Sequence, residues 1–351
     1  MSKNTYISLF SSAGVGCYGF KISDFECIAT LELIERRLNI QKINSKCKYD
    51  SGYICGDITQ TDIKTRLYDE ITFWKLKEKI NDIDVVIATP PCQGMSVANH
   101  KKTENEIKRN SLVIESINII RNIMPKFFIF ENVPAFMKTL CTDNDKNDKA
   151  IGEAIEYNLG DNYKYIAKVL NFKNYGSNSS RTRTLVIGVR NDIAAFCSPY
   201  DFFPDYSEER TLRTVIGDLM PLNNPYDFDP NDIYHFFRYY NQSMRNWISG
   251  LKEGKSAFDN PKIEDRPHQI IDGKIVENVR KNGDKYTRQF WDKVGPCIHT
   301  RNDQLASQNT IHPSDDRVFS IRELMRLMSI PDTFKWSSIP ISNLNSLSHK
   351  D

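Results

Sequence analysis

Strand-like and helix-like hydrophobic patterns alternate through the first half of the chain. Short apolar runs predict buried strands, and each is followed by a segment with apolar residues at helical spacing. The predicted strands are residues 6–10, 27–30, 53–55, 84–88, 127–130, 169–172 and 184–189, and the predicted helices are 14–20, 32–38, 73–80 and 112–123. Such alternation is typical of an α/β fold, with a doubly wound, mostly parallel sheet and helices on both faces.

The pattern changes after Arg190. Residues 202–290 are rich in Pro, Asn, Asp and Tyr and show little periodicity. This composition predicts a second, smaller and irregular domain of short strands and loops. A helical pattern returns at 320–328, and residues 337–351 are polar and poorly patterned.

Composition narrows the class of protein. The chain has 351 residues and a net charge of +2, which argues neither for nor against a nucleic-acid partner. No apolar run approaches the ~18 residues that span a bilayer, and the N-terminus has no signal-peptide pattern. Eight cysteines, at positions 17, 27, 47, 55, 92, 141, 197 and 297, form no Cys-x-x-Cys pair. We therefore expect a cytoplasmic protein with no metal centre, no disulfide framework and no membrane partner.

Cys92 lies just after a predicted buried strand, in the stretch Pro90-Pro91-Cys92-Gln93. Ligands of open α/β sheets bind at the carboxyl ends of strands. The two prolines fix the backbone there, and the residues up to Ser96 let it turn away. A cysteine held in this way is placed to act as a nucleophile. Taken alone, it is as well explained as a small buried hydrophobe, which most free cysteines are.

Two acids and a small-residue loop follow the first three predicted strands. Glu32 follows the second strand and Asp57 the third, where acids can bind ribose hydroxyls and an adenine amino group. Each acid alone is more often a surface carboxylate or a helix cap. The loop lacks the Gly-x-Gly-x-x-Gly pattern of dinucleotide sites, but its small residues allow a ligand to approach the backbone. These loop residues are Ser12, Ala13 and Gly14. Together the strand ends predict a nucleoside-shaped pocket.

Two further polar motifs lie beside later strands. Glu131-Asn132-Val133-Pro134 follows the strand at 127–130, where a carboxyl can serve as a proton donor. Arg181 and Arg183 come just before the strand at 184–189, and alternation along a strand would point both the same way. In isolation, a capping acid and ordinary basic surface residues would explain these motifs.

Taken together and in this order, the motifs resemble those of the DNA cytosine-5 methyltransferases of bacterial restriction–modification systems. The resemblance covers about residues 6–190 and 294–336. It includes the cofactor loop from Leu9 to Gly14, the Pro91-Cys92-Gln93 nucleophile motif, Glu131-Asn132-Val133, and Arg181-x-Arg183. A late motif runs from His312-Pro313 through Arg322-Glu323-Leu324-Met325-Arg326-Leu327 to Pro331-Asp332. Several motifs in fixed order are far more specific than any one of them.

The resemblance implies a reaction and a role for each motif. S-adenosyl-L-methionine would donate a methyl group to C5 of a cytosine flipped out of duplex DNA, leaving S-adenosyl-L-homocysteine. Cys92 would attack C6 and so make C5 nucleophilic. Glu131, with Asn132 beside it, would hold and protonate the ring N3. Arg183 would bond the ring O2 or orient Glu131, supported by Arg181.

The resemblance also assigns binding residues and domains. The methyl donor would contact Phe10, Ser12, Ala13, Gly14, Glu32, Asp57, Ile58 and Pro91. Candidate DNA contacts are Gln93, Ser96, Arg238 and Arg245, for which solvated surface is the alternative. Residues 1–191 would form the catalytic and cofactor-binding domain of a Rossmann-like methyltransferase, and 192–293 the target-recognition domain. Residues 294–351 would be a return segment that supports both and is truncated.

The chain departs from the family pattern in several places. Ser8, Ser12 and Val15 replace an acid and two glycines, and Asn178-Ser179 stands where Pro-Gln is common. A terminal Gly-Asn/Glu-Ala-Val-Pro motif, which completes the family's cofactor pocket, is missing. A second polypeptide could supply it, or the chain could be an inactive truncated product. Two other interpretations of the function stay open: a transfer-RNA cytosine methyltransferase with the same catalytic residues, and a non-enzymatic DNA-binding or regulatory protein. A cognate restriction endonuclease is a family-level expectation.

Overall fold

The computed structural model describes residues 3–91, 110–278, 285–299, 302, 305 and 311–339. Cys92, Gln93 and Ser96 therefore lie outside the described residues. The chain forms two compact units. The first unit comprises residues 1–170, 182–204 and 335–337, and the second comprises 171–181, 205–334 and 338–351. The functional division at 191/192 and 293/294 stays a prediction.

The first unit is built on a seven-stranded sheet with the order β3-β2-β1-β4-β5-β9-β8. The strands β1 to β5 pair in parallel, and β9 pairs antiparallel with β5. Their bounds are β1 Thr5–Leu9, β2 Glu26–Glu32, β3 Tyr53–Cys55, β4 Val85–Ala88, β5 Phe127–Asn132, β8 Tyr163–Asn171 and β9 Thr182–Arg190. The prediction of an α/β fold with a mostly parallel sheet is confirmed.

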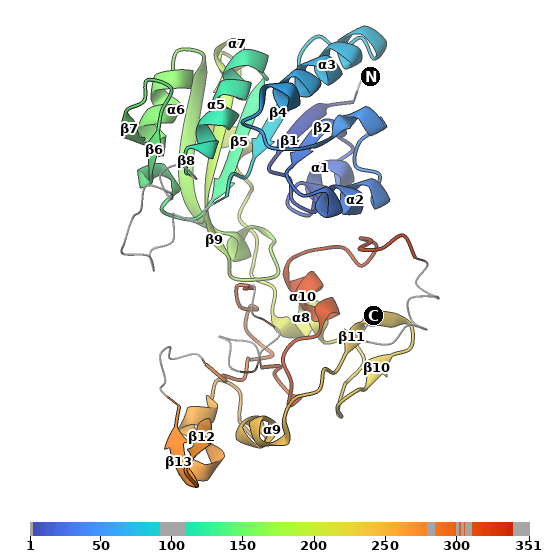
Figure 1. The fold of residues 1–351 in the computed structure, drawn as a ribbon, viewed down its shortest axis with the longest axis vertical. Helices are drawn as coiled ribbons and strands as arrows, with labels where there is room; N and C mark the ends of the chain where they lie inside the picture. The colour runs from blue at the N-terminus through green and yellow to red at the C-terminus, as the bar shows by residue number, and fades with distance from the viewer. Residues whose placement is uncertain are drawn as a thin grey trace. The chain divides into compact units, whose positions relative to one another are not determined.

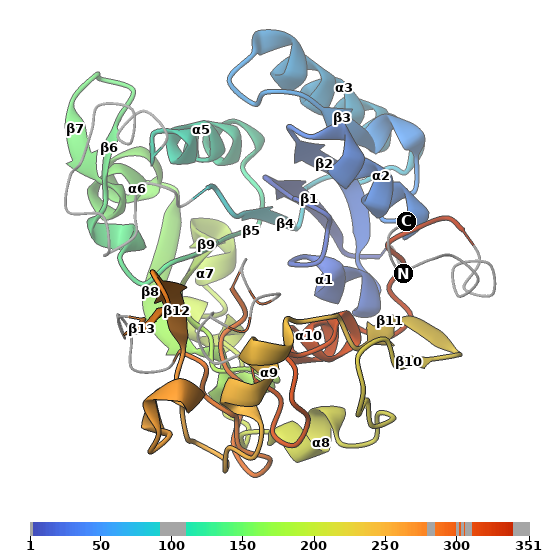
Figure 2. The ribbon, with the colours of Figure 1, turned by 60° about the horizontal axis from the view of Figure 1, so that its bottom comes forward.

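Helices cover both faces of this sheet, because apolar side chains project from its strands on both sides and must be buried. In β4, Val86 and Ala88 belong to the larger core, which includes α3 and α5, whereas Val85 and Ile87 pack on the side of α1 and α2. Figure 2 shows α3 and α5 on one side of β1 and β4 and α1 on the other. The helices are α1 Tyr18–Ile22, α2 Glu35–Ile43, α3 Thr61–Lys77, α5 Leu112–Ile123, α6 Ile151–Leu159 and α7 Asn191–Ala194.

Some predicted elements differ from the observed ones. The helix expected at 14–20 starts only at Tyr18, because Gly14 has a left-handed φ of 83° that a helix does not allow. Glu32 ends β2 instead of starting α2. The helix expected at 73–80 begins twelve residues earlier, at Thr61 instead of Phe73, since its buried face is spaced by three to four residues among polar ones. The hairpin of β6 (Leu140–Thr142) and β7 (Asp148–Ala150) was not predicted.

Within its described residues, the second unit contains only short elements, as its composition predicts (Figure 1). Two antiparallel hairpins pair β10 with β11 and β12 with β13. The elements are β10 Phe228–Asp229, β11 Asp232–Phe236, β12 His268–Ile271, β13 Lys274–Glu277, α8 Leu212–Ile216, α9 Gln242–Ile248 and α10 Ile321–Leu327. Six described 3₁₀ turns add to the two units: Asp50–Gly52, Phe136–Lys138, Phe172–Tyr175, Pro199–Phe202, Ala257–Asp259 and Ile263–Asp265.

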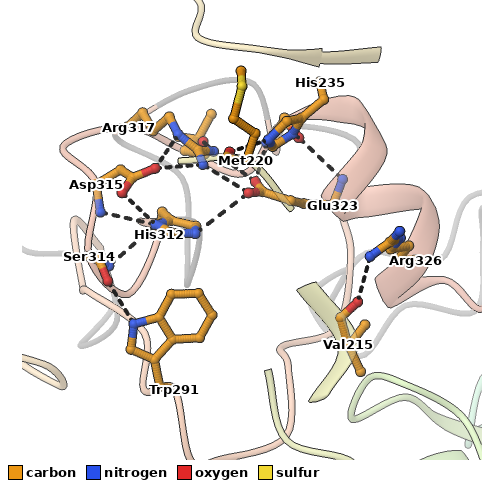
Figure 3. Close-up of polar contacts among 12 residues, drawn as sticks. Val215, Met220, His235, Trp291, His312, Ser314, Asp315, Arg317, Glu323 and Arg326 are labelled. Atoms are coloured by element: carbon orange, nitrogen blue, oxygen red, sulfur yellow. Dashed lines mark hydrogen bonds and ion pairs between the residues drawn. The ribbon is translucent and has the colours of Figure 1, made fainter. Parts of the chain in front are cut away.

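A buried polar network at the start of α10 holds the second unit together (Figure 3). Arg317 donates two hydrogen bonds to the carboxylate of Glu323, at 2.7 and 2.8 Å, and a third to Asp315. The Nδ1 of His312 accepts from the backbone N–H of Asp315 at 3.0 Å. Glu323 also accepts from the N–H of Ser320 at 2.7 Å, closing a capping box. The late motif recognised in the sequence therefore supplies the polar core of this unit.

Burial gives the network a pH dependence. Desolvation lowers the pKa of His312 to about 4, although Glu323 opposes this effect. The unfolded chain binds a proton at this histidine below about pH 6.5, whereas the folded chain does so only near pH 4. We therefore expect the free energy of unfolding to fall between these values, by at most ~1.4 kcal/mol per pH unit from this group.

Denaturant unfolding at pH 7, 6 and 5 tests this. His312→Gln should lower the stability at pH 7 and also flatten the decline, because the variant lacks the titrating imidazole. His299→Gln, at an exposed position, is the matched control and should leave the decline unchanged. If the free energy of unfolding declined equally with falling pH in wild type and His312→Gln, His312 would not be the group that causes the decline.

Candidate active site

A cavity of about 580 Å³ lies in the first unit where its parallel strands end. Of the predicted cofactor residues, six line it: Phe10, Ser12, Glu32, Asp57, Ile58 and Pro91. Ala13 and Gly14 belong to the same loop but are not among its lining residues. The lining also includes Leu31, Leu33, Ile34, Arg37, Gly56, Thr89 and Leu112, which were not predicted. Most of these directly adjoin the strand-end motifs, and this adjacency is the signal that could have found them.

The loop after β1 has an unusual backbone. Phe10 and Ser12 have φ values of 56° and 49°, in the left-handed region that residues other than glycine rarely adopt. The N–H of Ser12 donates to Oε2 of Glu32 at 2.8 Å. Oε1 of Glu32 accepts from the N–H of Ile34 at 3.1 Å and from Arg37 at 3.2 Å. The end of β2 thus fixes the loop that follows β1.

Asp57 has a structural role at the cavity wall. Its Oδ1 accepts from both the N–H and the hydroxyl of Thr59, each at 2.9 Å, in the turn that leads into α3. This is an Asx turn and not a helix cap, because the N-cap of α3 is Gln60. The same residue lines the cavity, so the two roles do not exclude each other.

Side-chain bonds tie the segment before Cys92 to both neighbouring strands. The hydroxyl of Thr89 donates to the carbonyl of Phe10 at 3.1 Å, which connects it to the loop after β1. The side-chain amide of Asn132, at the end of β5, donates to the carbonyl of Pro90 at 2.9 Å. Asn132 is buried, and its oxygen accepts from the N–H of Val133. Thr89 and Pro90, which precede Cys92 in the sequence, are therefore held from both sides.

Glu131 and Arg183 form an ion pair on neighbouring strands. Arg183 Nε lies 3.1 Å from Oε1 of Glu131, and both side chains are partly exposed. The antiparallel register of β5 and β9, which pairs Glu131 with Leu185, brings them together. Arg181 precedes β9 and belongs to the second unit, where its carbonyl accepts from the N–H of Phe172 at 2.9 Å.

The two predicted DNA-reading arginines of the second unit have different surroundings. Arg238 is exposed. Arg245, on α9, is partly buried, with its guanidinium 5.4 Å from the centre of the Phe237 ring and its Nε without a hydrogen-bond partner. These contacts support a packing role for Arg245 more than a free surface role.

Two properties of the described residues bear on metal ions and membranes. These residues contain no group of three or more His, Cys, Asp or Glu side chains arranged to hold a metal ion. No helix among them has both the length and the apolar character that a membrane crossing requires.

Comparisons with known proteins point to one family. The model of the C-5 cytosine-specific DNA methylases matches residues 4–343. Type II methyltransferase M1.HgaI of Avibacterium volantium is 30% identical, over 95% of this chain and 90% of the relative. Type II methyltransferase M1.HphI of Haemophilus parahaemolyticus is 31% identical, over 94% and 78% of the two chains.

Solved structures agree on the fold. A DNMT2 variant of Spodoptera frugiperda aligns with a TM-score of 0.57 at 14% identity, over 98% of this chain and 94% of that one. Dnmt2 of S. pombe aligns with a TM-score of 0.55 at 14% identity, over 98% and 92%. The family match extends over both units. The chain therefore belongs to the family of C-5 cytosine-specific DNA methylases.

Proposed function

We propose that the protein transfers a methyl group from S-adenosyl-L-methionine to C5 of a cytosine flipped out of a specific duplex DNA sequence, through a covalent bond between Cys92 and C6. The observation that carries this proposal is the arrangement at one sheet edge. The cavity and the segment leading to Cys92 follow neighbouring parallel strands, and the Glu131–Arg183 pair joins the end of β5 to the start of β9. We further propose that a restriction endonuclease accompanies the enzyme, as in restriction–modification systems.

The residues of the cavity suit S-adenosylmethionine. The cavity volume of about 580 Å³ falls in the range of small-molecule and cofactor sites, roughly 300–1,000 Å³. Glu32 and Asp57 can accept hydrogen bonds from ribose hydroxyls and an adenine amino group, while Phe10 and Ile58 provide apolar walls. The cofactor would supply an electrophilic methyl group, and its product would be S-adenosyl-L-homocysteine.

The protein side chains would carry the other steps. The thiolate of Cys92 adds to C6 of the cytosine and turns C5 into a nucleophile. Glu131 holds a proton at N3, and Arg183 orients Glu131 through the 3.1 Å contact. After methylation, loss of the C5 proton and of Cys92 restores the aromatic ring. The target base must leave the helix for this chemistry, because C6 is inaccessible in a stacked duplex.

Cys92→Ser should abolish methylation, because a serine hydroxyl is far less nucleophilic than a thiolate. The measurement is incorporation of labelled methyl groups into mixed-sequence duplex DNA, with transfer RNA as the alternative substrate. DNA containing 5-fluorocytosine should trap wild type covalently and leave Cys92→Ser free. Methylation of transfer RNA alone would favour the RNA enzyme, and absence of both labelling and trapping would favour a regulatory protein.

Asn132→Ala should lower kcat by about 10- to 100-fold, because the segment before Cys92 loses its tie at Pro90 and the nucleophile shifts. The Kd for S-adenosylmethionine should change less than twofold, since Asn132 does not line the cavity. Asn122→Ala, at the exposed end of α5, is the control and should leave both unchanged. An unchanged kcat in Asn132→Ala would remove the positioning role.

One observation favours the two-chain alternative. A second cavity, of about 300 Å³, opens on the sheet face beside α1. Its apolar lining includes Val85 and the partly exposed rings of Phe20, Phe25 and Phe127. Parallel sheets are ordinarily covered on both faces, so apolar side chains here would be stabilised by a helix from a second polypeptide.

Equilibrium binding tests this alternative. If a second chain completes the enzyme, a fragment carrying the Gly-Asn/Glu-Ala-Val-Pro motif should raise the affinity for S-adenosylmethionine by tenfold or more. Phe127→Asp, which places a charge on the apolar face, should remove that gain. High affinity of the 351-residue chain alone, unchanged by the fragment, would exclude the two-chain arrangement.

A further inference from the structure

Behind the cofactor loop lies a buried glutamine that no step of the proposed reaction uses. Gln41, on α2, is 1% exposed and is not among the residues lining the cavity. Its amide nitrogen donates to the hydroxyl of Ser11 at 2.8 Å and to the carbonyl of Ser12 at 2.5 Å. Its amide oxygen accepts from the hydroxyl of Thr30 at 2.7 Å and from the ammonium of Lys46 at 2.9 Å. Both hydrogens and the oxygen of this buried amide are therefore used.

Lys46 determines which way this amide points. An ammonium group only donates hydrogen bonds, so it must face the amide oxygen and not the NH₂ group. Lys46 is itself fixed by a 2.8 Å hydrogen bond to the hydroxyl of Thr30, and it lies 5.9 Å from the centre of the Tyr6 ring. With the oxygen directed toward Lys46, the NH₂ group must point at the loop. A flipped amide would place two donors against the ammonium and an acceptor against the carbonyl of Ser12.

The backbone conformation of the loop after β1 requires stabilising contacts of this kind. The Ser12 peptide is held at its N–H by Glu32 and at its carbonyl by Gln41, while the residue keeps a left-handed backbone. Left-handed conformations of residues other than glycine persist only where surrounding contacts enforce them. Gly14 packs closely on the same side chain, because a Cβ placed there would lie 2.9 Å from Cγ of Gln41. Gln41 thus stabilises the loop through both hydrogen bonds and packing.

We propose that Gln41 and Lys46 are a positioning pair for the methyl-donor site: Gln41 holds the loop of Phe10 and Ser12 in its binding conformation, and Lys46 sets the orientation of the Gln41 amide. Neither residue lines the cavity, so both act through the loop. The inference rests on the proposed use of S-adenosylmethionine. It adds two residues that lie between the recognised motifs, after the cofactor loop that ends at Gly14 and before Pro91.

A double-mutant cycle on the full chain tests the pair, with the Kd for S-adenosylmethionine measured by titration calorimetry. Gln41→Met is close in size but removes all of the amide's bonds, and should raise the Kd about tenfold. Lys46→Met removes only the orienting donor and should raise it about threefold. If Lys46 acts through Gln41, the double variant should be no weaker than Gln41→Met. The Kd for duplex DNA should stay unchanged in all three.

Two further measurements separate positioning from general damage. Asn39→Met, at an exposed position of the same helix, is the matched control and should retain the wild-type Kd. Hydrogen exchange without any cofactor should be faster at the amides of Ser11 to Gly14 in Gln41→Met and Lys46→Met, with β5 unaffected. This readout keeps the test valid if binding by the chain alone is weak.

The possible results have distinct meanings. Unchanged Kd values, additive effects of the two substitutions, or equal losses of cofactor and DNA affinity would overturn the positioning pair. Failure of wild type to bind S-adenosylmethionine, with or without the added motif fragment, would instead refute the proposed function and this inference with it. Selective, non-additive weakening with faster exchange of the loop would establish the pair.

Discussion

The parallel pairing of β1, β2, β3, β4 and β5 is the constraint on which the site depends. In a parallel sheet all carboxyl ends meet at one edge, so loops far apart in the sequence become neighbours. The loop after β1, Glu32 at the end of β2, Asp57 after β3 and Pro91 after β4 form one cavity for this reason. The antiparallel strand β9 then adds Arg183, because its chain direction brings that residue back toward the end of β5.

Several polar side chains at this edge form hydrogen bonds with backbone groups of the neighbouring loops. Glu32 binds the N–H of Ser12, Asn132 binds the carbonyl of Pro90, and Thr89 binds the carbonyl of Phe10. Loops of unfavourable backbone conformation need such partners, since they gain nothing from regular hydrogen-bond ladders. The conformation of the loops at the site is therefore stabilised by side chains of the sheet edge itself. The second unit uses a similar principle, with the carboxylate of Glu323 satisfied by Arg317 and by the cap of α10.

The sequence predicted the elements whose pattern is local. The helix Leu112–Ile123 was predicted at its observed bounds, because apolar residues at helical spacing are followed by Pro125. Strand assignments held to within a few residues where runs of apolar residues are buried on both faces. The first half of α3 was missed although Ile63 and Leu67 lie at helical spacing, because the residues around them are mostly polar or charged. The start of α1 was misplaced because Gly14 has a left-handed φ, which the apolar spacing of the segment does not reveal.

The sequence by itself determined the family, the sheet architecture and the order of the motifs, since these depend on residue types and short-range spacing. Tertiary structure alone decided which residues meet. The 3.1 Å pairing of Glu131 with Arg183 depends on strand register, and the bond from Asn132 to Pro90 on strand order. The packing of Gln41 and Lys46 behind the loop depends on where α2 lies against the sheet. No local pattern encodes these contacts, because each joins segments that become neighbours only when the chain folds.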